Sequence, residues 1–352
     1  MLRWRAALLL TPMPSSLERA HRAQLHHARR ALGVLGLLAV WIPAEALAAD
    51  CDAAQSPCVP ASSLWVRAGY SRWQSLPAPR LTEPGQLSVN LTGEYAYKPL
   101  LLEVPSPDPD GREIRVVHHR IGTTLGARYS PVSGVEVGLS LPFVAYQTGA
   151  GTSAVTDRSA DPIPRSALGD PRLEARYRLT DGDYGSFDAG AFILFPLGNQ
   201  SAHAGEPSFV IAPELIWGGR LGRLSMGGGL GVRLRKTVDL GNASYGSQLS
   251  LQLALDLEIV ERWLSLATEA QVLSGFVARE VQVDADTRTR HLERPAEWLA
   301  GVRSEPLERL QLAIMAGTAL PFGSETTRTH SETFASLSAA RFHGLLDARY
   351  RF

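Results

Sequence analysis

The stretch QLSLQLALDLEI, residues 248–259, alternates apolar and polar side chains with a period of two. Leu249, Leu251 and the following leucines fall on one face, while Gln248, Asp256 and most of their alternate neighbours fall on the other. Successive side chains of a β-strand point to opposite faces, whereas a helix would scatter these leucines around its circumference. The stretch therefore predicts a strand with one oily and one polar face.

The same alternation recurs along the chain. We identify twelve segments of 11 to 16 residues: 86–97, 115–130, 133–147, 168–180, 184–196, 208–219, 222–236, 246–260, 262–275, 294–304, 308–321 and 340–352. Strands of globular proteins usually have about 5–6 residues, and a tilted membrane-spanning strand needs about 9–11. The lengths therefore favour strands that cross a membrane.

The links between these segments alternate strictly between long and short. The long links are 98–114, 148–167, 197–207, 237–245, 276–293 and 322–339, and the short ones fall near 131–132, 181–183, 220–221, 261 and 305–307. Outer-membrane barrels combine an even strand number with short periplasmic turns and long extracellular loops. We predict an all-β fold, a closed antiparallel transmembrane β-barrel of about twelve strands over residues 86–352. A soluble periplasmic β-protein, with the leucines packed at its centre, is the alternative.

The residues before the barrel carry an export signal. Arg29-Arg30 precede an apolar run that ends in Ala46-Leu47-Ala48, which together are typical of a secretory signal peptide over residues 1–49. A membrane anchor is the alternative, which Pro43 disfavours. Residues 50–85 are rich in Pro and Ser, lack a period, and are interpreted as a periplasmic N-terminal extension or linker. Trp65, Tyr70 and Trp73 indicate that part of it packs, with the barrel mouth as one place to do so.

Two cysteines, Cys51 and Cys58, lie just beyond the predicted cleavage site. In an oxidising compartment they can close a small disulfide loop. A lipid anchor on Cys51 is the alternative, which Asp50 disfavours because a small residue is preferred there.

The charge balance restricts the class of partner. The chain has 352 residues with 35 Lys and Arg against 35 Asp and Glu. A nucleic-acid binder would normally carry a basic excess, so we expect no nucleic-acid partner. The expected partners are outer-membrane lipid, and small molecules or ions inside the barrel.

Two motifs resemble a known family. They are Ser140-Leu141-Pro142-Phe143, and Leu168-Gly169-Asp170 followed by Arg176-Tyr177. They resemble the barrels of outer-membrane proteins of the phenol-degradation meta-pathway type and the N-terminal barrel of long OmpA-family proteins. The resemblance implies a porin-like barrel that passes or binds small molecules. The family's usual Pro-Thr-Gly is Pro196-Leu197-Gly198 here, which is a departure.

The chain ends on Tyr350-Arg351-Phe352, inside the last predicted strand. A terminal aromatic residue on an alternating strand resembles the ending that the barrel assembly machinery is thought to read, so this machinery is an expected partner through Phe352.

The polar faces predict a charged lumen. Its candidate lining residues, called here the lumen charges, are Arg120, Arg128, Arg172, Glu174, Arg176, Arg178, Glu214, Arg233, Arg235, Asp256, Glu258, Glu269, Asp347 and Arg349. Buried charges must pair or stay hydrated, which leaves three interpretations: a structural salt-bridge network, a wet pore whose arginines attract anions, or a lumen plugged by residues 50–85.

No enzyme signature accompanies this pattern. A G-x-S-x-G elbow is absent, His330-Ser331 falls in a predicted loop, and His118-His119 are expected on opposite faces of a strand. Gly227-Gly228-Gly229 lies within a predicted strand, where it lets the wall bend or a side chain cross the lumen. We expect no catalytic, cofactor or metal site. The predicted function is passive passage or binding of small molecules through the charged lumen, and the alternative is a non-conducting structural or adhesion barrel with partner-binding loops.

Overall fold

A computed structural model describes Cys51 and residues 56–77, 81–103, 113–152, 163–182, 185–240, 243–276, 279–282, 288–291, 294–320, 335–337 and 339–352. Backbone contacts divide the chain into two units, Met1–Ala46 and Leu47–Phe352, and all the described residues belong to the second. The signal peptide predicted for residues 1–49 lies outside the described residues and remains a prediction.

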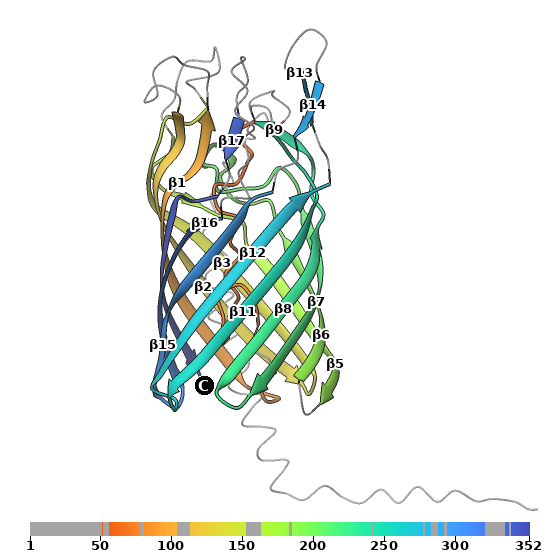
Figure 1. The fold of residues 1–352 in the computed structure, drawn as a ribbon, viewed down its shortest axis with the longest axis vertical. Coiled ribbons are helices and arrows are strands. Elements are labelled where there is room, and N and C mark those ends of the chain that lie inside the picture. Colours follow the sequence, from red (N-terminus) through yellow and green to blue (C-terminus); the bar gives the residue numbers. More distant parts are fainter. Residues whose placement is uncertain are drawn as a thin grey trace, which may run out of the picture. The chain divides into compact units, whose positions relative to one another are not determined.

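In this second unit, twelve long strands form a closed antiparallel barrel (Figure 1). They are β1 (Leu87–Glu103), β2 (Glu113–Val132), β3 (Val135–Thr148), β5 (Arg172–Gly182), β6 (Gly185–Leu194), β7 (Val210–Leu221), β8 (Leu224–Arg233), β11 (Gln248–Val260), β12 (Leu264–Gly275), β15 (Ala296–Leu307), β16 (Leu310–Ala319) and β18 (Phe342–Arg351). Each overlaps one of the twelve predicted segments, so the predicted fold class is confirmed.

The barrel closes because β1 pairs on both sides. Ser88 lies opposite Arg128 of β2 and opposite Arg351 of β18, so the first and last strands are neighbours. Closure leaves no open edge in the ladder, which is what a strand wall in hydrocarbon requires, since lipid offers no hydrogen-bond partners.

Short elements decorate the long-link end of the barrel. They are β4 (Ala167–Leu168), the 3-10 turn Gln200–Ala202, β9 (Val238–Leu240), β10 (Ala243–Tyr245), β13 (Arg279–Gln282), β14 (Arg288–His291) and β17 (Ala335–Leu337). They are too short to produce a readable period in the sequence. The strand predicted over 168–180 is a partial error, since β5 begins only at Arg172. Gly169, Asp170 and Pro171 interrupt the ladder there, and proline has no N–H to donate.

The two faces of the wall point as predicted. Along β11 the even-numbered residues from Gln248 to Glu258 are buried and the odd-numbered leucines are exposed. Leu253 is 58% exposed, whereas Asp256 is 0% exposed. Such an outward row of leucines is stable against lipid and costly in water. None of the described helices is long and apolar enough to cross a membrane.

Aromatic side chains border this outward apolar face at both ends. Tyr177, Trp263 and Phe352 are exposed near the short turns, and Phe143 and Trp298 are exposed nearer the long links. Amphipathic rings prefer the headgroup zones of a bilayer, which produces aromatic girdles in outer-membrane barrels.

The barrel interior is occupied by residues 56–77, called here the plug. At the long-link end the Ser56 amide donates to the Asp239 carbonyl oxygen of β9 (2.8 Å). At the short-turn end, just beyond the plug, the Thr82 amide donates to the Glu136 carboxylate of β3 (2.7 Å). Figure 1 shows the plug in orange, descending inside the wall. Residues 56–77 therefore lie against the inner face of the wall, where Trp65 and Trp73 had indicated packing, and the extension or linker over residues 50–85 stays a prediction.

Candidate functional site

Arg67, near the middle of the plug, is held by the wall and by the plug itself. Its Nη1 and Nη2 donate to the two carboxylate oxygens of Glu214 on β7 (2.6 and 2.7 Å). Its Nε donates to the Ser75 carbonyl oxygen (2.7 Å), and Glu174 lies 3.7 Å from Nη1. The bidentate geometry is the strong form of an arginine–carboxylate pair. It fastens the plug to the wall and folds residues 67–75 back on themselves.

Wall charges also satisfy the plug's backbone. Glu269 of β12 accepts from the Gln74 amide (2.6 Å) and from the amide and hydroxyl of Ser75 (2.8 and 2.7 Å). Arg349 of β18 donates to the Ser71 carbonyl oxygen (3.0 Å) and to Gln74 Oε1 (2.7 Å). An irregular segment is stable in a buried position only when its N–H and C=O groups form hydrogen bonds. The charged lumen supplies them.

Glycines in the wall make room for the plug's larger side chains. A Cβ on Gly227 would lie 2.6 Å from the ring of Trp73, and one on Gly229 would lie 2.8 Å from Leu76. Trp73 and Leu76 are 1% and 0% exposed. The glycines of β8 therefore leave space inside the wall for Trp73 and Leu76. This agrees with one of the two roles that the sequence indicated for Gly227-Gly228-Gly229, which is to let a side chain cross the lumen.

Eleven of the fourteen lumen charges are buried, and Arg178, Glu214 and Arg235 are half-buried. Several pair with one another or with neighbouring wall residues: Arg128 with Glu174 (2.5 Å), and Arg176 with Asp188 (3.4 Å). Others reach the plug, as Asp256 does with Arg72 (2.7 Å). Their arrangement matches a salt-bridge network around a plug. The wet pore whose arginines attract anions stays a prediction.

The outer end of the plug is held by a disulfide bond and by apolar packing. A disulfide joins Cys51 to Cys58, the pair for which the sequence indicated a loop. Val59 and Ala61 follow it into a buried cluster with residues of β1, β2, β9 and β10, whose members include Leu100, Leu102, Val116, Val117, Val238, Leu240 and Tyr245. This cluster packs the start of the plug against the wall at the long-link end.

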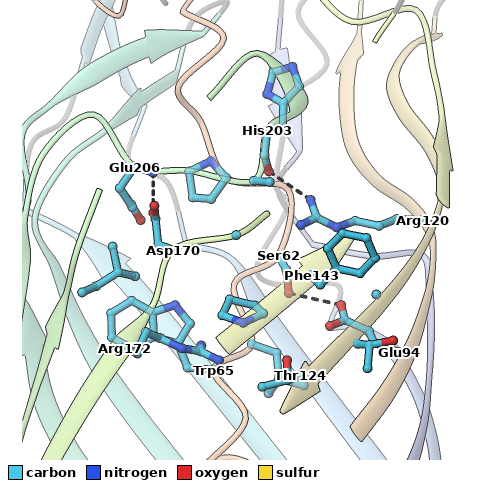
Figure 2. A pocket seen from close by; sticks show the side chains of 18 residues that line it. Ser62, Trp65, Glu94, Arg120, Thr124, Phe143, Asp170, Arg172, His203 and Glu206 are labelled. Atoms are coloured by element: carbon cyan, nitrogen blue, oxygen red, sulfur yellow. Dashed lines mark hydrogen bonds between the residues drawn. The ribbon is translucent and has the colours of Figure 1, made fainter. Parts of the chain in front are cut away.

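A cavity of about 70 Å³ remains between the plug and the wall (Figure 2). The plug contributes Ser62 and Trp65 to its lining. The wall and the loops contribute Glu94, Thr124, Phe143, Asp170, Arg120, Arg172, His203 and Glu206, among others. Arg120 donates to the His203 carbonyl oxygen (3.0 Å), and Ser62 donates to Glu94 (3.2 Å).

Titratable groups in the loops beside this cavity are strongly perturbed. Burial raises the pKa of Asp170 to about 7, although its carboxylate accepts from the Gly198 and Glu206 amides (2.7 and 2.6 Å). Burial lowers the pKa of His203 to about 4, against the opposing effect of its hydrogen bond to the Val59 carbonyl oxygen. Burial also raises the pKa of Glu206, which pairs with Arg235 at 2.7 Å.

The sequence identified the wall charges but missed the groups that meet them. Arg67 and Glu206 lay outside the set of lumen charges because they belong to segments without a period. Asp170 lies in the predicted segment 168–180 but ahead of β5, where the alternation does not hold. Trp65 and Trp73 were the available signal for packing. His118 and His119, expected on opposite faces, have ring centroids 4.0 Å apart where the β1–β2 ladder is irregular. In the described ranges no group of three His, Cys, Asp or Glu side chains could hold a metal ion. His330 and Ser331 fall outside the described residues.

A closed antiparallel barrel with an apolar outer face and a charged inner face is an outer-membrane β-barrel of bacteria. No protein-family model matches the chain, and no curated protein matches it. Among solved structures, the chain is similar to the COG4313 outer-membrane channel from Pseudomonas putida F1, with 14% identity and a TM-score of 0.52 over 78% of this chain and 97% of that one. The NanC porin matches with 9% identity and a TM-score of 0.45 over 74% and 98% of the two chains. The first likeness supports the fold.

Proposed function

We propose that this protein is a channel for small polar solutes or ions whose lumen is closed by its own plug, so that passage requires the plug to move. The observation that carries the proposal is the seat of residues 67–75 on wall charges, above all the Arg67–Glu214 pair. Every polar partner of the plug is a group that water can also hydrate. The same wall therefore suits both a closed lumen and a wet, open one.

A non-conducting structural or adhesion barrel is the second candidate. The contacts that favour it are those at the outer mouth, where Val59 and Leu100 are both 0% exposed in a cluster closed by the disulfide loop. A plug that never moves would make the barrel a rigid wall that carries loops.

Single-channel recording in planar bilayers separates the two. We expect the wild type to conduct only in brief openings. Arg67→Glu brings a third carboxylate beside Glu214 and Glu174 and should produce long openings, because like charges at this distance repel strongly. Arg262→Glu, at an exposed position in a short turn, is the matched control and should behave as the wild type.

Heat-modifiable migration on gels verifies that each variant is a folded barrel. Folded Arg67→Glu protein that stays as silent as the wild type would favour the structural barrel. Steady conduction by the wild type, with the plug still protected from protease, would contradict the gating role of the plug.

A further inference from the structure

We propose that the outer ends of β1, β2 and β18 form a binding site for the phosphate of an anionic lipid headgroup in the outer leaflet, with Arg115 and Arg341 as its main donors. The site is called here the rim site, and it consists of Lys98, Arg115, His118, His119 and Arg341. The inference does not depend on whether the plug moves.

An aromatic row marks the level at which these three strands leave the apolar zone of the membrane. Tyr97 of β1 lies opposite Phe342 of β18 and opposite His119 of β2. Tyr95, the preceding outward position of β1, is 36% exposed, and its ring centroid lies 6.2 Å from that of Phe342 and 6.1 Å from that of His119. The row therefore belongs to the aromatic girdle at the long-link end of the barrel.

The distance along β1 agrees with this level. Leu87, at the start of β1, is paired with Tyr129 of β2, and Tyr97 lies ten residues further along the strand. At roughly 3.3 Å per residue and a tilt of about 40°, ten residues rise about 25 Å. This is the height of the apolar band of an outer-membrane barrel, which is about 25 Å. Lys98 therefore lies where the headgroup layer begins.

The rim site has an excess of positive charge. Glu113 accepts from both Lys98 and Arg341, so two cations share one carboxylate. Arg115 is exposed, and no ion pair joins it to another of the described residues. The positive charges of Arg115 and Lys98 both act on His118. Within the described part of the chain, three permanent cations are thus matched by a single paired carboxylate, and the site attracts anions.

The surroundings of the two arginines favour a phosphate that belongs to a lipid. Arg341 engages Glu113 through Nη2, which leaves its Nε and Nη1 for another acceptor. Guanidinium groups donate pairs of hydrogen bonds to phosphate oxygens. Below the aromatic row, Leu91 and Ile121 are 54% and 45% exposed and offer an apolar surface to the acyl chains of the same lipid. Those chains hold the headgroup at the height of the rim site, whereas a free phosphate ion gains nothing from the apolar wall.

Native mass spectrometry of the folded protein, released from non-ionic detergent, tests the rim site. Lipid A, which carries phosphate on a sugar headgroup, should bind saturably, whereas dephosphorylated lipid A and phosphatidylcholine should not. Arg115→Gln and Arg341→Gln should each weaken the binding of lipid A about fivefold, and the double variant about thirtyfold, the usual effect of one and two cations beside an anionic lipid surface. The double variant Arg223→Gln, Arg262→Gln removes two exposed cations from the short turns and is the matched control.

Arg115 and Arg341 are exposed, so their variants should fold, and heat-modifiable migration on gels verifies this for each one. Competition with sodium phosphate separates the two sources of phosphate, and lipid A should stay bound at millimolar phosphate. The proposal is overturned by displacement of lipid A under these conditions, by equal binding of dephosphorylated lipid A, or by equal losses in the double variant and the matched control. Since the rim site lies on the outer face of the wall, failure of the channel proposal would leave these results unchanged.

Discussion

Replacing Gly227 by valine should drive the plug from its seat, because Gly227 is where the wall makes room for Trp73. The ideal Cβ at this position lies 2.6 and 2.7 Å from two ring carbons of Trp73. The ring must retreat by at least the 0.8 Å that separates 2.6 Å from ordinary contact at 3.4 Å. Trp73 is 1% exposed, so there is little free space into which it can move.

The size of the effect follows from the cost of overpacking. Extra methyl groups in a filled interior typically cost about 1–3 kcal/mol. If this cost is confined to the closed state, the ratio of closed to open barrels falls roughly 5- to 150-fold. The neighbouring Gly228 provides a control of the same residue type in the same strand. A Cβ there meets nothing nearer than 3.7 Å, since Gly228 faces outwards.

The assay compares Gly227→Val, Gly228→Val and wild-type protein in planar bilayers, after heat-modifiable migration has established that each is folded. Gly227→Val should increase the open fraction, and Gly228→Val should not. Trp73→Ala in the Gly227→Val background should remove the clash. Equal open fractions in the two glycine variants would refute the role of Trp73 as an anchor of the closed state.

Three further predictions concern other parts of the plug. Arg67→Leu should lower the free energy of unfolding by about 3–5 kcal/mol, since it leaves Glu214 buried and unpaired, whereas the double variant Arg67→Leu, Glu214→Leu should lower it much less. Urea unfolding of refolded protein measures both variants, and equal losses would contradict the importance of the Arg67–Glu214 ion pair. The double variant Cys51→Ser, Cys58→Ser should reduce the stability of the plug at the outer mouth by roughly 2–3 kcal/mol, the loop-closure value for a separation of 7 residues. It should also expose the plug to protease, and unchanged protease protection would refute this role of the disulfide. The pKa of Asp170 is raised to about 7 from its ordinary 3.8, so its contribution to stability is full below pH 3.8 and is lost as the pH rises through 7. The wild type should therefore melt at a lower temperature at pH 8 than at pH 5, and Asp170→Asn should flatten this difference, which a stability independent of pH in the wild type would contradict.

The sequence predicts the wall well because membrane strands obey a simple rule. Lipid accepts no polar side chain on the outer face, so a residue such as Asp256 must alternate with leucines for the whole length of β11. The alternation persists over each strand, and each turn resets it. Because the same alternation occurs in twelve segments, the strands of the barrel can be predicted from the sequence even though each segment alone is weak evidence.

The plug could not be predicted in the same way, because an irregular segment surrounded by wall on all sides has no preferred face. Arg67 contacts β7, whereas Trp73 and Leu76 contact β8, and no regular period links the three positions. The two available signals were indirect: aromatic residues in a Pro- and Ser-rich segment, and the missing side chains of Gly227 and Gly229. The pairing of the wall charges was equally hidden, since Asp256 meets Arg72 and Arg303, which lie far from it in the sequence.

The balance between the closed and the open barrel is set by apolar contacts and by hydrogen bonds to buried charges together. When the plug leaves, Glu214 and Glu269 regain water, so each hydrogen bond to these carboxylates contributes a net value of about 1.5–3 kcal/mol to closure.

 
Trp73 and Leu76 contribute a similar amount, because burying a large apolar side chain is worth about 1.5–3 kcal/mol, and this is lost when the side chain returns to water. Val59 and its cluster at the outer mouth add contacts of the same kind. A ligand or partner that opens the barrel must therefore compensate for apolar surface at two places, the glycine seat of β8 and the outer mouth. If Leu76→Ala, in a folded barrel, left the open fraction unchanged, the apolar contribution to closure would be refuted.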